Sequence, residues 1–311
     1  MEVTQVSVEL VGSSIVTAAT FFLIPTLGEI YAERSGILNL GIEGMIISSA
    51  AGAFGATFLT GNILIGILAG MVIGGILAFI HGVMSITLSR NQVVSGISLT
   101  ILGTGLSGLL GRDFVGRTIV ALQPIPIPGL SAIPFIGPVF FTKDILVYVS
   151  YILVPVLWFV LFRTRLGILI RTVGENPTAA YTQGVNVNLI RYFCVVLGGV
   201  LSGLGGAYMT LAWMPAWTEG MTGGRGWIVI ALTVVALWHP ITAFVGSYIF
   251  GIFQVIQFSF QLSGIPVAFI NMLPYLSTIT FMVVWGILLS KQKVKRIIGA
   301  PSALCVPFEK G

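Results

Sequence analysis

The sequence predicts an all-α fold: a polytopic bundle of about nine transmembrane helices, with eight to ten as the range. Of the 311 residues, 56% are hydrophobic and only 8% are charged, whereas a soluble domain carries roughly 25% charged residues. Several apolar runs reach the ~20 residues that a helix needs to span a bilayer. The pairs Gly70/Gly74 and Gly199/Gly203 have the small-xxx-small spacing that brings transmembrane helices close together. We therefore expect a tightly packed bundle that forms a single domain over residues 1–311.

Nine apolar runs mark the expected spans. They lie near residues 8–31, 36–60, 62–89, 92–111, 145–162, 189–212, 226–239, 240–262 and 269–290. The run at 226–239 is short for a full crossing, so a re-entrant segment is the alternative there. The stretch 111–144 holds five prolines, at 124, 126, 128, 134 and 138, which prevent a continuous helix. It is expected to form either an ordered extracellular cap or a plain connector.

The distribution of Lys and Arg predicts the orientation. With the N-terminus outside, nine crossings leave the C-terminus in the cytoplasm, and the 15 basic residues divide into 11 inside and 4 outside. This division follows the positive-inside rule. The net charge of +5 is thus explained by topology and does not indicate nucleic-acid binding. The inner set is Arg34, Arg90, Arg163, Arg165, Arg171, Arg191, Lys291, Lys293, Lys295, Arg296 and Lys310, and the outer set is Arg112, Arg117, Lys143 and Arg225.

The most polar stretch is GENPTAAYTQGVNV, residues 174–187, on the predicted cytoplasmic side. Asn176 is a good N-cap, and Pro177 suits the first helical position. Glu175 places negative charge at the positive end of the helix dipole, and Gly184 suits the left-handed position that ends a helix. The pattern predicts a helix of about two turns, which is too short to be stable without a surface to pack on. An ordinary surface loop and a docking helix both fit these residues.

Two acidic residues, Glu29 and Glu43, lie at membrane depth in the predicted spans. Intramembrane ionisable groups are costly, so each indicates a function by default. Gly41 and Gly44 flank Glu43 closely enough to let the helix bend, so that Asn39 and Glu43 face the bundle interior. A structural hydrogen bond between helices is the alternative for either acid, and snorkelling toward the cytoplasmic interface beside Arg34 is a second alternative for Glu29.

Polar residues also open the run at 92–111. Asn91, Gln92 and Ser95 can offer neutral hydrogen bonds to a passing solute, or they can cap the helix. With few charges nearby, such a path favours a neutral polar solute over a phosphate. The candidate translocation path consists of Asn39, Glu43, Asn91, Gln92 and Ser95.

An ATP-binding loop is not found in this sequence. A Walker A loop requires a Gly-Lys step, and the five lysines follow Thr, Ser, Gln, Val and Glu. No cofactor is therefore expected in this chain. No cluster of His, Asp or Glu, or activated Ser, Cys or Lys, at one depth indicates a catalytic or metal site. If transport is driven by ATP, a separate subunit binds ATP and Mg²⁺.

Three stretches together resemble the permeases of nucleoside-type ABC importers, a family related to the ribose and branched-chain amino acid permeases. They are GEIYAERSGILNLGIEGM at 28–45, NQVVSGISLTILGTGL at 91–106 and GENPTAAYTQGVNVNLIRYFCVVLGGVLSGLGGAYMTL at 174–211. A fourth stretch, MTGGRGWIVIAL at 221–232, also fits. The resemblance covers most of the chain in the same order and is weakest in the Pro-rich stretch and after Lys291.

The resemblance implies a type II ABC importer permease fold and a transport subunit that is not itself an enzyme. It makes residues near 163–190 the coupling segment, with nucleosides as the expected solute. The implied partners are an ABC ATPase subunit, a second permease chain (the same or related) and an extracellular substrate-binding lipoprotein, in the plasma membrane. The implied ATPase contacts are Gly174, Glu175, Asn176, Pro177, Ala179, Ala180 and Gly184.

Two alternatives stay open. Within the same class, the solute can be a simple sugar or a branched-chain amino acid. Outside it, a secondary transporter working without ATP would be expected to carry an internal inverted repeat, and the two halves of this sequence do not align by eye.

Overall fold

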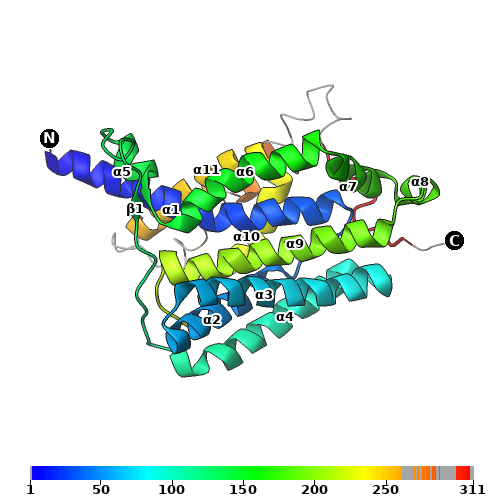
Figure 1. Cartoon of the computed structure of the whole chain (residues 1–311), viewed down its shortest axis with the longest axis horizontal. Helices are drawn as coiled ribbons and strands as arrows, with labels where there is room; N and C mark the ends of the chain where they lie inside the picture. The colour runs from blue at the N-terminus through cyan, green and yellow to red at the C-terminus, as the bar shows by residue number, and fades with distance from the viewer. Residues whose placement is uncertain are drawn as a thin grey trace.

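The computed structural model describes residues 2–260, with side chains from 8 to 257, scattered positions between 269 and 287, and residues 299–308. Helices dominate this part of the chain (Figure 1). Two of them continue into short π-helical turns, Val83–Thr87 and Met209–Trp213, and a 3-10 turn covers Arg112–Phe114. The remaining elements are α1 (Glu2–Arg34), α2 (Ile42–Thr60), α3 (Ile63–Gly82), α4 (Gln92–Gly111), β1 (Ile125–Pro126), α5 (Ile136–Phe140), β2 (Thr142–Lys143), α6 (Ile145–Arg163), α7 (Arg165–Glu175), α8 (Pro177–Thr182), α9 (Val187–Tyr208), α10 (Arg225–Val235) and α11 (Pro240–Phe260).

Seven helices in the described ranges are long and apolar enough to cross a membrane. The all-α, multi-pass character of the fold is thereby confirmed. The count of about nine spans is not confirmed: α10, at the expected span 226–239, has 11 residues and is too short to cross. The expected span at 269–290 lies outside the described residues, apart from isolated positions. The seven are Val8–Arg34, Ile42–Thr60, Ile63–Thr87, Gln92–Phe114, Ile145–Arg163, Val187–Trp213 and Pro240–Gln257.

The predicted glycine spacing is used where α3 and α9 pack together. A Cβ added at Gly74 would lie 2.2 Å from the carbonyl oxygen of Gly199, and one added at Gly203 would lie 2.3 Å from that of Gly70. Only glycine permits backbones to approach this closely. The close packing expected from the sequence is therefore confirmed, and it joins helices of the same chain.

The expected span 36–60 is wrong over its first residues. The helix α1 ends at Arg34 and α2 begins only at Ile42, so residues 35–41 form a non-helical connection. The chain turns sharply at Gly36, whose φ of +93° favours glycine. We call residues 35–41 the α1–α2 break; most of its residues are buried.

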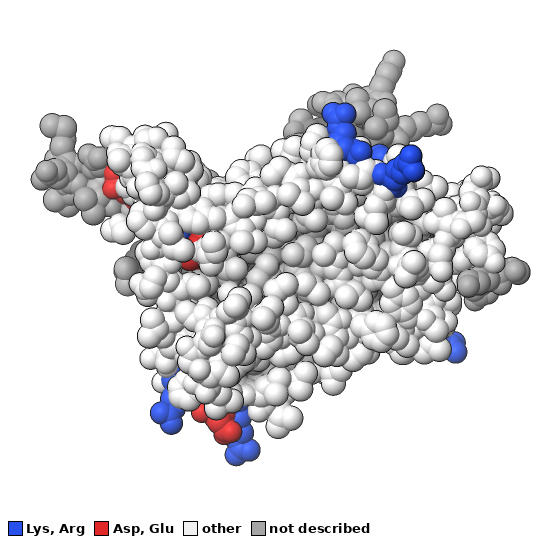
Figure 2. Space-filling model, viewed as in Figure 1, with Lys and Arg blue, Asp and Glu red and all other residues white. Residues whose placement is uncertain are grey.

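Different structures close the two ends of the bundle. The Pro-rich stretch is ordered: β1 pairs with β2 in antiparallel register, Ile125 opposite Lys143. The ammonium group of Lys143 donates to the carbonyl oxygen of Ser13, at 2.7 Å, and fastens this stretch to the N-terminal part of α1. At the opposite end lie α7, α8 and the C-terminus (Figure 1). On the face drawn in Figure 2, charged side chains gather near the helix ends and leave the flank between them uncharged, as expected for a surface that contacts lipid.

Candidate functional site

Side chains from distant helices satisfy the backbone of the α1–α2 break. Non-helical backbone at membrane depth is tolerated only where its polar groups find partners inside the protein. The N–H of Leu38 donates to Oε1 of Gln92 at 2.8 Å. The hydroxyl of Thr100 donates to the carbonyl oxygen of Leu40 at 2.9 Å. Thus α4 supplies both a donor and an acceptor to the break.

Further partners come from α1, α3 and the break itself. The N–H of Asn39 donates to Oε1 of Glu29 at 3.1 Å, and that of Gly41 donates to Oδ1 of Asn39 at 3.0 Å. The imidazole of His81 contacts the Leu38 carbonyl oxygen through Nε2, at 3.1 Å. The break is therefore held by a polar network inside an otherwise apolar bundle.

Glu43 caps the first turn of α10 from another helix. Its carboxylate accepts from the hydroxyl of Thr222 at 2.6 Å, from the N–H of Gly224 at 2.9 Å and from the N–H of Gly226 at 2.5 Å. A carboxylate is stabilised there because the N-terminus of a helix carries partial positive charge and free N–H groups. A Cβ at Gly226 would lie 2.6 Å from the Cα of Glu43, so glycine permits this approach.

The N-termini of two helices, α2 and α10, thus meet inside the bundle. In transporters, interrupted helices with their ends at membrane depth are the strongest structural indication of a substrate path. The break and the Glu43 contact together form the candidate translocation site.

The five predicted path residues are not all brought together. Asn39 and Gln92 bond the break, and Glu43 bonds α10. The hydroxyl of Ser95 contacts Nδ1 of His81 at 3.0 Å, and Oδ1 of Asn91 accepts from the N–H of Val93 at 2.9 Å, which caps α4. These contacts fit the structural alternatives left open by the sequence, and contact with a solute stays a prediction for each residue.

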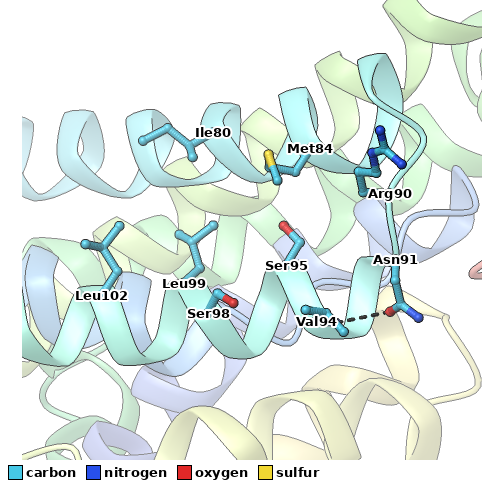
Figure 3. Close-up of a pocket in the computed structure, with 9 residues that line it drawn as sticks. All are labelled: Ile80, Met84, Arg90, Asn91, Val94, Ser95, Ser98, Leu99 and Leu102. Atoms are coloured by element: carbon cyan, nitrogen blue, oxygen red, sulfur yellow. Dashed lines mark hydrogen bonds between the residues drawn. The ribbon is translucent and has the colours of Figure 1, made fainter.

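Asn91 and Ser95 also line a cavity of about 490 Å³ between α3 and α4 (Figure 3). Ile80 faces it from α3 and Met84 from the π-helical turn that follows, and polar groups gather where α4 begins. Gln92 follows Asn91 in the sequence but is not among the lining residues. The full lining is Ile80, Met84, Arg90, Asn91, Val94, Ser95, Ser98, Leu99 and Leu102.

The predicted polar helix is confirmed as α8. The Asn176 side chain accepts from the N–H of Ala179 at 2.9 Å, and Pro177 takes the first helical position. Gly184 ends the turn with φ of +81°, and its N–H donates to the carbonyl oxygen of Tyr181 at 2.9 Å. Asn176, Pro177 and Gly184 therefore occupy the helix-end positions that the sequence predicted.

The seven predicted contact residues divide between two faces. Gly174, Pro177 and Ala180 are buried, whereas Glu175, Asn176, Ala179 and Gly184 are exposed. A Cβ at Gly174 would lie 2.0 Å from the carbonyl oxygen of Arg34, so this glycine lets α7 approach the end of α1. The three buried residues pack the segment against the bundle, and the four exposed residues lie on the surface that a partner can contact.

Two arginines assigned to the cytoplasmic side are buried. Nε of Arg34 donates to the carbonyl oxygen of Trp238 at 3.1 Å. Nε of Arg191 donates to that of Ser35 at 3.2 Å, next to the break. The sequence reading missed these roles, and it also missed Thr100 and Thr222. For Arg191, the sequence did offer one indication of burial, because the residue lies at the start of an apolar run.

Comparison with known proteins gives a consistent picture. The family described as "Branched-chain amino acid transport system / permease component" matches residues 12–298. The chain is 43% identical over 250 residues, 79% of it and 76% of the relative, to the "Putative glucose ABC transporter permease protein TsgC13" of Haloferax volcanii. It is 32% identical over 333 residues, 100% of it and 99% of the relative, to the "Guanosine ABC transporter permease protein NupQ" of Bacillus subtilis. It is 32% identical over 288 residues to the "Nucleoside ABC transporter permease protein NupC" of Lactococcus lactis. That alignment covers 88% of this chain and 91% of the relative.

Proposed function

This chain belongs to the family of the branched-chain amino acid transport system permease component, and from that premise we propose that it carries nucleosides. It is a multi-pass membrane permease subunit of an ABC transporter and not itself an enzyme. Family membership decides between the two classes that the sequence left open, against a secondary transporter. ATP hydrolysis belongs to a separate ATPase subunit, which binds ATP and Mg²⁺ in our proposal.

One observation carries the nucleoside proposal: the similarity to a guanosine permease extends over 100% of this chain and 99% of that protein. The placement of Glu43 supports a neutral solute. Its carboxylate occupies the N-terminus of α10, which would otherwise attract an anion. A sugar is the second candidate, because the 43% identity to a glucose-permease relative is higher, although it covers 79% of this chain.

We further place α7 and α8 in the cytoplasm, with the N-terminus outside and the C-terminus inside. Arg163 and Arg165 at the α6–α7 junction and Arg171 within α7 support this, because basic residues accumulate on the cytoplasmic side. The stretch 111–144 then faces outward, where a substrate-binding lipoprotein would dock. The membrane would be the plasma membrane, and a second permease chain, the same or related, would complete the path.

In this arrangement the ATPase meets the exposed residues Glu175, Asn176, Ala179 and Gly184. Movement of α8 reaches the bundle through its buried face and through Gly174, which touches the end of α1. The α1–α2 break follows directly, so the ATPase contact and the candidate translocation site are linked by a short chain of packed groups. Such coupling requires two states that ATP binding biases differently.

The solute is tested by uptake into proteoliposomes that contain this chain, its ATPase, the second permease and the binding lipoprotein. ATP-dependent uptake of labelled guanosine is measured with unlabelled uridine or glucose as competitor. Competition by uridine and not by glucose is the expected result. Competition by glucose alone would transfer the assignment to the sugar alternative.

A further inference from the structure

Residues 299–308, which we call the C-terminal strap, touch both the proposed ATPase contact and the α1–α2 break. The N–H of Ala303 donates to the carbonyl oxygen of Gly174 at 2.9 Å, and that of Cys305 donates to the carbonyl oxygen of Gly36 at 3.2 Å. We propose that the strap is a positioning segment for transport that transmits the movement of α8 to the break. This inference rests on the proposed function, because it takes α8 to be the ATPase contact.

On the α8 side, the strap is held by both polar and apolar contacts. The hydroxyl of Ser302 donates to Oε2 of Glu175 at 2.8 Å. Phe308 packs on the cluster of Val173, Ala180 and Val187, and its ring lies 5.7 Å from that of Tyr181. The strap therefore contacts the coupling segment in two places: the carboxylate of Glu175 and the buried face of α8.

On the side of the break, the strap presses on the turn at Gly36. A Cβ there would lie 3.0 Å from Nη2 of Arg191 and 3.1 Å from the carbonyl oxygen of Ala303. The turn is thus enclosed between the strap and the arginine that binds the Ser35 carbonyl oxygen. A displacement of Ala303 reaches the break without an intermediate residue.

The strap can act as a rigid link because it is folded on itself. The N–H of Leu304 donates to the carbonyl oxygen of Pro301 at 3.0 Å, and that of Val306 donates to Ala303 at 3.1 Å. Pro301 and Ala303 are its buried positions, and the other side chains of the strap are exposed or half-buried. A substitution at a buried position of the strap therefore alters its seating, whereas one at an exposed position does not. In Figure 1 the red C-terminal trace lies at the α7–α8 end of the bundle.

The test compares the same substitution at a buried and an exposed position of the strap. Ala303 is 6% exposed and Val306 is 48% exposed. Each is replaced by Glu, and the whole complex is reconstituted with its ATPase for measurement of ATPase retention, ATP hydrolysis and solute moved per ATP. The larger, charged side chain does not fit the buried site of Ala303 without overpacking and desolvation, so we expect Ala303→Glu to displace the strap.

We expect Ala303→Glu to retain the ATPase and its hydrolysis while the solute moved per ATP falls about tenfold, within the range of allosteric coupling energies. Val306→Glu should stay within about twofold of the parent, as exposed substitutions do. An unchanged ratio for Ala303→Glu, or loss of the ATPase itself, would overturn transmission by the strap. Failure of the unmodified complex to bind an ATPase would instead overturn the proposed function.

A second measurement decides the matter if the Ala303→Glu chain does not fold and cannot be reconstituted. Ser302→Ala and Glu175→Ala each remove one partner of the hydrogen bond between the two side chains, so their effects on solute moved per ATP should be non-additive in the double variant. Additive effects would contradict the link between the strap and the coupling segment.

Discussion

The carboxylate of Glu43 accepts the backbone N–H of Gly226 at 2.5 Å, although the two residues are 183 positions apart. This contact joins the start of α2 to the start of α10 and satisfies backbone donors of Gly224 and Gly226 inside the bundle. A charge at membrane depth is tolerated here because hydrogen-bond donors and a helix dipole surround it. The contact therefore fixes where the two interrupted helices meet.

Replacing Glu43 by Gln should impair transport more than ATPase docking. The amide keeps the size of the side chain but loses the charge and presents an N–H₂ group to donors. Leaving buried donors unsatisfied costs about 1–3 kcal/mol, which predicts a drop in uptake of about tenfold or more. Uptake and ATPase retention are measured together, with Glu219→Gln at an exposed position as control. Unchanged uptake would mean that the charge of Glu43 has no role.

Gly226→Ala should destabilise the protein. The added Cβ would lie 2.6 Å from the Cα of Glu43, and overpacking of this kind costs about 1–3 kcal/mol. Gly105→Ala is the matched control, because nothing lies within 4 Å of its added Cβ. Thermal unfolding in detergent compares the two: the Tm should fall for the first variant and stay or rise for the second. Equal Tm values would argue against close packing at the α2–α10 meeting point.

Gly184→Val should uncouple ATP hydrolysis from uptake while the protein remains folded. Gly184 has φ of +81°, which a β-branched residue adopts only with strain. The end of α8 would shift, and the exposed contact surface would shift with it. Gly184→Asn is the matched variant, because Asn tolerates the left-handed region, and it should retain coupling. Normal uptake and normal ATP turnover in the Val variant would count against a coupling role for α8.

Thr100→Val should lower stability, since it removes the hydroxyl that binds the Leu40 carbonyl oxygen. The acceptor is partly buried, so leaving it unsatisfied costs about 1 kcal/mol, the lower end of the range for buried groups. Thr104→Val, one turn along the same helix, removes a hydroxyl that bonds only within α4 and should have little effect. Chemical denaturation in detergent distinguishes the pair. If both variants lose the same stability, α4 does not support the break.

The local features of this fold could be predicted from the sequence, because their causes are local. Asn176, Pro177 and Gly184 cap α8 through neighbouring residues, so their identities alone indicated a short helix. The seven described spans follow from long apolar runs in the same way. Their boundaries mostly agree within a few residues of those expected.

The α1–α2 break could not be predicted, because hydropathy does not reveal where backbone groups find partners. The segment ILNLG at 37–41 is as apolar as a helix interior. It stays non-helical because Gln92, His81 and Thr100, far along the chain, satisfy its backbone. For the same reason the partners of Glu43 could not be predicted. Its three donors, between residues 222 and 226, come close to the carboxylate only in the folded bundle.

The central claim is that α8 docks an ABC ATPase, and a photo-crosslinker placed at the exposed Ala179 tests it most directly. The chain is cross-linked in its native membrane, extracted mildly, and the adduct is identified by mass spectrometry. The same probe at Leu59, 75% exposed near the end of α2, is the control. We predict an adduct with a Walker A-containing ATPase from Ala179 and not from Leu59. A chain that is extracted alone, gives no such adduct and still moves solute without ATP would contradict the claim.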